Sequence, residues 1–282
     1  MRLLSLAAAA GAAVLAAAPA FAASTQAPLK DVRWSFESPI GFYDQEQLQR
    51  GYKVYKEVCS ACHAMSMVAF RNLGDKGGPF YDPNYKNPND NPVVKTLARD
   101  VQYPDIDSDT GEAIHRPGTT ADYFPNPFPN PVAARAANGG ALPPDMSLLE
   151  AAREGGARYI YSVVTGDGTT PPAGLTVPTG KYYDPWMAGD LTGNWKGDPK
   201  NVPVGGFIAM PPPLTANRVT FDDGTPATID QEAKDVAAFL TWAADPKMDE
   251  RKELGIEVMI FLVVFSGLLY ASYRSIWRKV GH

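Results

Sequence analysis

The chain has 282 residues, of which 45% are hydrophobic, enough for one sizeable core with small appendages. Its 31 acidic and 26 basic residues give a formal net charge of −5, so the balance gives no indication of nucleic-acid binding and better suits a basic protein partner. The chain has only two cysteines, three positions apart, which argues against a disulfide framework.

The first 22 residues have the pattern of a secretory signal peptide. Arg2 precedes a short apolar run, and residues 20–22 (Ala-Phe-Ala) have the small side chains of a cleavage site. A short membrane anchor is the alternative, but the run is short and the triplet favours cleavage. We therefore expect residues 1–22 to be a signal peptide and the mature chain to begin at Ala23, outside the cytoplasm.

The first predicted helix begins after an irregular segment over residues 24–43. Asp44 is a good N-cap, and Gln47, three residues on, is expected as its capping-box partner. Apolar side chains then recur at helical spacing as far as Val58, which predicts one buried face.

The middle of the chain is rich in proline and glycine and is predicted to be mostly loop. Between residues 74 and 118 only the stretch 93–101 has helical spacing. Over residues 123–131 every second residue from Pro125 on is a proline, which excludes an interior helix or strand. We expect a stiff loop there, lying across a surface.

Three further helices are predicted before the C-terminal region, over residues 131–137, 148–155 and 229–243. Ser147 is the expected N-cap of the second, and Pro246 ends the third. Residues 159–164 are expected as a helical turn or a short strand, and residues 165–209 as loop. Since no repeat or second domain boundary is evident, residues 23–253 are predicted to form one extracytoplasmic domain.

A membrane anchor is predicted near the C-terminus. Residues 255–273 are apolar apart from a few positions such as Glu257, and at about 1.5 Å each they reach about 28 Å, close to the hydrocarbon thickness of a bilayer. Basic residues follow, which places that end in the cytoplasm. A buried core helix is the alternative, but the basic stop argues against it. We expect a span over residues 254–274 and a cytoplasmic tail over residues 275–282.

The two cysteines lie in the run Cys-Ser-Ala-Cys-His at residues 59–63, the sequence form of c-type haem attachment. Two thiols three positions apart on one turn reach the two vinyl groups of one porphyrin edge. The next residue then places an imidazole beneath the iron. We therefore predict one covalent haem c, held by Cys59 and Cys62, with His63 as an axial iron ligand.

A thioredoxin-like redox pair and part of a zinc site are the alternatives for this run. A redox pair is expected in a βαβ context, whereas an amphipathic helix precedes Cys59. Zinc needs further Cys or His ligands, and the only other histidines are His115 and His282. The exported address also favours haem, because c-type haems are assembled outside the cytoplasm.

The second axial ligand is sought among the methionines, since electron-transfer haems use His with Met or His with His. His115 is expected in a charged loop and His282 on the cytoplasmic tail. Four methionines remain that are neither next to His63, at the N-terminus nor in the membrane: Met146, Met187, Met210 and Met248. Three prolines stiffen the loop after Met210. Core packing is the alternative, so the residues alone leave Met210 open, with Met187 as the next candidate.

Several motifs follow the haem run in order: NPVAARAANGGALPPDMS (130–147), AMPPPL (209–214), DDGTPAT (222–228) and DVAAFLTWAADP (235–246). Together they resemble the cytochrome c1 family, the haem subunits of the cytochrome bc1 complex, ubiquinol:cytochrome c oxidoreductase. The likeness extends from about Trp34 to Lys279. It implies a mostly α fold with long loops, a class I cytochrome c-like haem domain plus one C-terminal transmembrane helix.

The resemblance also implies a set of site residues. It assigns thioether links to Cys59 and Cys62, iron ligation to His63 and Met210, and a place beside a haem propionate to Arg135. A solvated helix charge is the alternative for Arg135. The loop over residues 123–131 is then a candidate to cover the haem.

The function that the resemblance implies is one-electron transfer within a larger enzyme rather than catalysis by this chain. The Rieske iron–sulfur protein is the implied donor, cytochrome c the acceptor and cytochrome b the membrane partner, in a dimeric complex of a bacterial inner membrane with the haem domain in the periplasm. A free-standing, membrane-tethered electron shuttle is one alternative. A haem peroxidase or sensor with an open iron site is another, although a six-coordinate iron disfavours it.

The chain departs from its resemblance to the family in two respects. Some bacterial relatives carry an additional cysteine pair that braces the ligand loop, and this chain has none. The prolines 211–213 and packing must then hold Met210. The loops over residues 74–118 and 165–205 match the family poorly, so no sites are assigned there.

Overall fold

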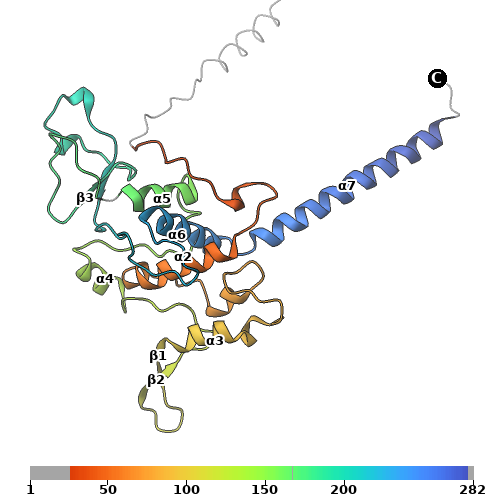
Figure 1. The fold of residues 1–282 in the computed structure, drawn as a ribbon, viewed down its shortest axis with the longest axis horizontal. Helices are drawn as coiled ribbons and strands as arrows, with labels where there is room; N and C mark the ends of the chain where they lie inside the picture. Colours follow the sequence, from red (N-terminus) through yellow and green to blue (C-terminus); the bar gives the residue numbers. More distant parts are fainter. Residues whose placement is uncertain (1–25, 167, 279–282) are drawn as a thin grey trace, which may run out of the picture.

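The computed structural model describes residues 26–166 and 168–278, so the predicted signal peptide lies outside the described residues. Its α-helices are α2 (Gln45–Glu57), α3 (Pro92–Arg99), α4 (Pro131–Ala137), α5 (Gly156–Gly166), α6 (Ile229–Ala244) and α7 (Met248–Trp277). Short 3-10 helices are η1 (Ser35–Glu37), η2 (Cys59–Ala61), η3 (Phe70–Gly74), η4 (Pro88–Asp90), η5 (Thr192–Asn194) and η6 (Pro199–Asn201). Two antiparallel pairs of strands complete it, β1 (Gln102–Ile106) with β2 (Ala113–Pro117) and β3 (Tyr182–Asp184) with β4 (Gly206–Ile208). Figure 1 shows a head of helices and loops from which α7 projects.

Helix α2 begins where the sequence predicts. The side chain of Asp44 accepts a hydrogen bond from the backbone N of Gln47 at 3.1 Å, as an N-cap does. The capping-box role of the Gln47 side chain was wrong, however. Its amide donates instead to Asp235 of α6 at 3.1 Å, because α6 lies against α2 and a buried carboxylate there needs donors.

The core of the head is built on the crossing of α2 and α6. Phe239 of α6 lies between two tyrosines of α2, with ring centroids 5.7 Å from Tyr52 and 5.8 Å from Tyr55. Gly51 allows the close approach, since a Cβ added there would lie 2.0 Å from the backbone oxygen of Asp235. Figure 1 shows α5 lying along the side of α6 that faces away from α2, so α2 and α5 flank α6 within the head.

Replacing Gly51 by alanine is expected to destabilise the head by about 1–3 kcal/mol, the usual cost of forcing extra volume into a packed interface. Alanine favours helix by about 1 kcal/mol over glycine, and the clash has to outweigh that gain. Urea unfolding of the purified protein measures the difference. Gly193→Ala is the control, since a Cβ there meets nothing within 4 Å. Equal stabilities of the two variants would contradict the close crossing.

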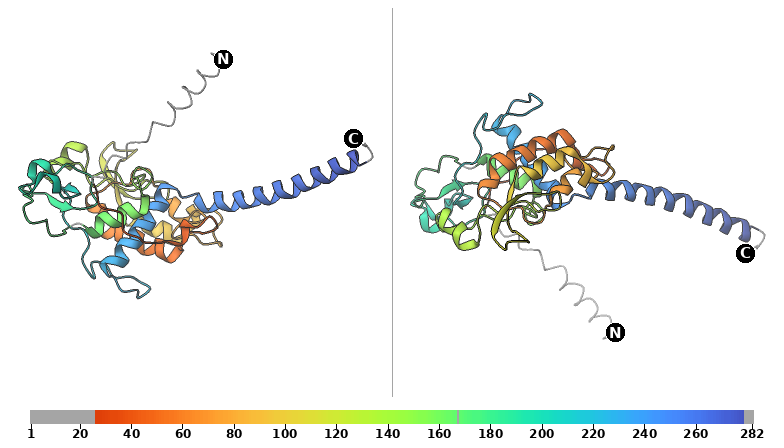
Figure 2. Two further views of the ribbon diagram at one scale, coloured as in Figure 1. Left: turned by 90° about the horizontal axis from the view of Figure 1, so that it is seen from above. Right: turned by 90° about the horizontal axis from the view of Figure 1, so that it is seen from below.

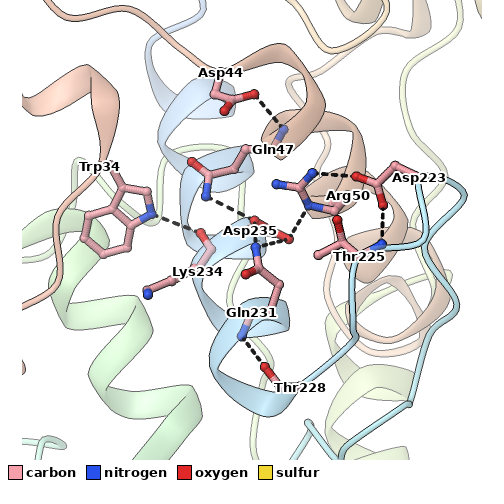
Figure 3. Close-up of polar contacts among 10 residues, drawn as sticks. All are labelled: Trp34, Asp44, Gln47, Arg50, Asp223, Thr225, Thr228, Gln231, Lys234 and Asp235. Carbon is pink, nitrogen blue, oxygen red and sulfur yellow. Dashed lines mark hydrogen bonds and ion pairs between the residues drawn. The ribbon is translucent and has the colours of Figure 1, made fainter.

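A buried polar network joins the same two helices (Figure 3). The Asp235 side chain is fully buried, and its carboxylate accepts from Arg50 Nε of α2 at 2.8 Å. Gln231 and Gln47 donate to it as well, at 2.9 and 3.1 Å. Arg50 uses Nη1 for a second ion pair with Asp223, at 2.7 Å. The network therefore fixes α2 relative to α6 and to the segment before α6.

The helix predicted over residues 148–155 was wrong. That segment forms turns, and the helix begins only at Gly156. The expected N-cap is occupied, because the Ser147 hydroxyl accepts from the backbone N of Met67 at 3.0 Å. Gly155 has a φ of 87°, a left-handed conformation that interrupts a right-handed helix. Residues 159–164 accordingly lie inside α5, in helix rather than strand.

Two strand pairs occur in regions where the sequence predicts loop. The hairpin of β1 and β2 follows α3, which ends at Arg99 rather than at residue 101. Arg116 on β2 holds the hairpin, since its guanidinium pairs with Asp105 at 2.8 Å and with Asp122 at 2.7 Å. The second pair, β3 with β4, joins the middle of the predicted loop over residues 165–209 to its C-terminal end.

Helix α7 is continuous through the predicted span. Within the described residues it is the one helix long and apolar enough to cross a membrane. Both further views show it projecting from the head (Figure 2). Only residues 245–247 separate it from α6, so the link to the head is short.

Candidate functional site

A mostly apolar cavity of about 320 Å³ lies in the head. Its walls come from the segment 138–146, from α5, and from Val236 and Leu240 of α6. Both cysteines and His63 line it, so the structure brings the three predicted motif residues to one cavity. The apolar lining from α5 and α6 was not assigned to the site from the sequence, although their helical periodicity had identified a buried face on α6.

The two cysteines share one tight turn. The backbone nitrogens of Cys62 and His63 both donate to the carbonyl of Cys59, at 3.1 and 2.9 Å, which places both sulfurs beside the same cavity. Burial, with Cys62 adding to it, raises the pKa of the Cys59 thiol to about 12. A redox pair needs a thiolate near neutral pH, so this environment disfavours the thioredoxin-like alternative.

A hydrogen bond of Nδ1 fixes the orientation of the His63 ring. Nδ1 lies 2.9 Å from the carbonyl oxygen of Pro144, which only accepts hydrogen bonds, so Nδ1 carries the proton. The Nε2 lone pair is then free. Burial lowers the pKa of His63, and the bond to Pro144 opposes that shift. A neutral imidazole held by a backbone carbonyl is the usual state of a metal-ligating histidine.

Three of the four candidate methionines line the cavity: Met146, Met187 and Met210. Met248 is buried at the start of α7 instead. Met146 belongs to the His63 side, because its backbone N donates to the carbonyl of Ala64 at 2.8 Å. Met187 and Met210 follow the paired strands β3 and β4, so one small sheet positions both sulfurs.

Met187 and Met210 differ in what their sulfurs contact. The hydroxyl of Tyr159 donates to the Met187 sulfur at 3.7 Å, whereas no such bond is found for the Met210 sulfur within the described chain. Met210 is followed by Pro211, which also lines the cavity. The geometry therefore favours Met210 as the ligand, and this assignment remains a prediction.

Arg135 lies on α4 and is exposed, and its Nη1 donates to the carbonyl of Gly140 at 3.1 Å. It does not line the cavity, whereas Asn138 and Arg153 do. Its place beside a propionate remains a prediction. The loop over residues 123–131 does not line the cavity either, since Phe124 packs into the core.

The zinc alternative finds no ligand set in the part of the chain that the structure describes, where no three His, Cys, Asp or Glu side chains are arranged to hold a metal ion. Two thiols, one imidazole and thioethers around an apolar volume are instead the donor set of a c-type haem. The residues present therefore fit the predicted cofactor. Sequence reasoning missed Pro144, whose role depends on a carbonyl and so leaves no mark in residue type.

Comparison with known proteins decides the family. The model of the cytochrome C1 family matches residues 34–280. The chain belongs to the cytochrome c1 family. Members of that family carry one covalently bound haem c and have a class I cytochrome c-like fold, so the predicted cofactor and fold class are confirmed.

Individual relatives agree with this assignment. Cytochrome c1 of Rhodospirillum rubrum is 42% identical over 264 residues, covering 88% of this chain and 87% of that protein. "Cytochrome c1, heme protein, mitochondrial" of Saccharomyces cerevisiae is 42% identical over 246 residues, covering 87% and 69%. "Cytochrome b/c1" of Bradyrhizobium diazoefficiens is also 42% identical, over 87% of this chain, but the match spans only 35% of that relative's length.

Proposed function

We propose that this chain is the haem c subunit of ubiquinol:cytochrome c oxidoreductase and passes single electrons from the Rieske iron–sulfur protein to cytochrome c. The observation that carries the proposal is the convergence of Cys59, Cys62, His63 and Met210 on one apolar cavity. Membership of the cytochrome c1 family supports the complex to which the chain would belong.

Each residue of the site has a distinct task. Cys59 and Cys62 would hold a haem c through thioether bonds, and His63 would offer Nε2 to its iron because Pro144 occupies Nδ1. Met210 would supply the second ligand, from the loop after β4. A haem c bound there supplies a one-electron iron couple, whose potential a thioether ligand raises.

The remainder of the cavity keeps water away from the site. Its wall is mostly aliphatic and aromatic, from α5, α6 and the segment 141–146, so ligand exchange with solvent is disfavoured. With His63 and Met210 both available to the iron, a bound haem c would leave no position for oxygen or peroxide. This supports electron transfer over the peroxidase and sensor alternatives.

The predicted membrane topology determines which proteins each part of the chain can contact. With α7 as the single span, we propose that the head faces the periplasm, the C-terminus the cytoplasm, and that α7 packs with cytochrome b in a dimeric complex. The chain alone is then no enzyme, and quinol oxidation belongs to the assembly.

Purification from membranes in mild detergent tests the proposal. We expect a b-type haem and the electron paramagnetic resonance signal of a Rieske centre to accompany this chain in near-equal amounts. A lone haem protein that reduces cytochrome c without those partners would instead establish the free-standing shuttle.

A further inference from the structure

The loop over residues 38–42, between η1 and α2, exposes two large apolar side chains. Ile40 is 70% exposed and Phe42 is 45% exposed. The loop is nevertheless well held, because Ser35 Oγ donates to the carbonyl of Phe42 at 2.8 Å and the backbone N of Gly41 donates to Ser38 at 2.9 Å. Fixing apolar groups in water has a free-energy cost, and a partner that covers them removes it.

Lys252 of α7 fastens this loop to the base of the predicted membrane span. Its Nζ donates to three backbone carbonyls, those of Phe36 at 2.5 Å, Ser38 at 2.9 Å and Gly41 at 2.9 Å. Asp249, one turn earlier, accepts from the backbone N of Tyr43 at 3.2 Å. The first turns of α7 therefore hold both ends of the loop.

The loop lies at the level where α7 becomes apolar. Leu254, two residues after Lys252, is 59% exposed, and Ile256 is 38% exposed. Residues four apart share a helix face, so Ile256 continues the face on which Lys252 holds the loop. The loop and the start of the span thus lie next to each other, in the part of Figure 1 where the chain before α2 passes the base of α7.

We propose that the loop 38–42 is a second membrane contact, which places Ile40 and Phe42 in the interfacial layer of the bilayer beside α7. Aromatic side chains favour that layer, and apolar groups attached to a span enter it without separate recruitment. Lys252 suits the same depth, since its ammonium is satisfied by three carbonyls and lysines near the end of a span keep their charge at the interface.

A second contact changes how the head is supported. A head attached by a single helix is free to rotate and tilt about one point. A second contact beside that helix also restricts the rotation and tilt of the head relative to the membrane. The inference goes beyond the proposed electron transfer and depends on it only in that α7 crosses a membrane.

Photolabelling in a bilayer tests the inference. The full-length protein with its haem is reconstituted with a phosphatidylcholine that carries a diazirine near the glycerol end of one acyl chain, and labelled peptides are mapped by mass spectrometry. We expect label on residues 38–42 and on α7. The helix α4 is the control, because Val132 there is 77% exposed but α4 lies on the far side of the head from α7 (Figures 1 and 2).

Lys252→Ala is expected to lower the labelling of residues 38–42 relative to α7, since the loop loses its three hydrogen bonds. Lys247→Ala is the matched control, because that lysine makes a surface ion pair with Glu250 at 3.0 Å. An unchanged haem spectrum shows that the variants are folded. Label on α7 with none on the loop, as when another protein covers it, overturns the inference alone. An unlabelled α7 contradicts the proposed span instead.

Discussion

Replacing Met210 by alanine is expected to lower the haem potential and to abolish the low-spin spectrum of a haem with methionine ligation. The thioether stabilises the reduced iron, and alanine offers no ligand atom. Axial ligands set haem potentials over about 0.8 V, so a fall on the order of 0.1 V or more is expected. Redox titration and the absorption spectrum of the purified protein measure both effects.

Met187→Ala is the matched control for that experiment. Its sulfur lines the same cavity, just after the other strand of the same small sheet, but accepts a hydrogen bond from Tyr159. We expect the Met187 variant to keep the low-spin spectrum with a small change in potential. The open position of the Met210 variant is also expected to bind carbon monoxide, which the unaltered protein resists. An unchanged spectrum for Met210→Ala would move the assignment to Met187.

Replacing Asp235 by alanine is expected to destabilise the head by about 3–5 kcal/mol, the usual effect of breaking a buried ion pair from one side. The guanidinium of Arg50 would keep only its outer partner, Asp223, while two glutamine amides lose their acceptor (Figure 3). Burial raises the pKa of Asp235, with Arg50 and the glutamines opposing that shift. Chemical denaturation with haem absorbance as the readout measures the loss.

Two further variants separate charge from packing at this site. Asp235→Asn keeps the shape and one acceptor oxygen, so a smaller loss is expected than for alanine. The double variant Arg50→Met with Asp235→Leu removes both charges and is expected to approach the stability of the unaltered protein, because a buried pair is costly to desolvate. If Asp235→Ala unfolds at the same denaturant concentration as the unaltered protein, the network does not hold α2 against α6.

The helices that sequence reasoning located are those whose ends and faces are determined locally. Asp44 caps α2, Thr228 caps α6, and apolar residues recur at helical spacing along both. The helix over residues 131–137 begins at a proline preceded by an asparagine cap, which the structure confirms. In these cases the residues that predict the helix, its cap and its apolar positions, lie in the helix or within a few residues of it.

The elements that were missed depend on contacts that their own residue pattern does not reveal. The hairpin of β1 and β2 is largely exposed and lacks the alternation of a half-buried strand, and Arg116 holds it through Asp105 and Asp122. The segment 148–155 has helical spacing, but Ser147 is used by Met67 instead of capping it. No local pattern contains that contact.

The residues that would bind the haem could be predicted from the sequence, whereas the residues that line the rest of the cavity could not. The motif placed Cys59, Cys62 and His63 together because attachment geometry requires their spacing, and all three line the cavity. The residues alone left Met187 and Met210 both open, because two strands well separated in sequence bring both to one place, and the choice of Met210 remains a prediction. Pro144 acts through its backbone carbonyl, which any residue possesses.

The short link between α6 and α7 bears on how electrons arrive and leave. Only residues 245–247 separate the two helices, and α6 itself supplies Val236 and Leu240 to the cavity wall. The height of the cavity above the bilayer is therefore set by the covalent path from α7, with no tether long enough for the head to travel. Under the proposed function, each electron carrier therefore has to approach the cavity itself, so motion of the carriers, and not of this chain, would set the rate of encounter.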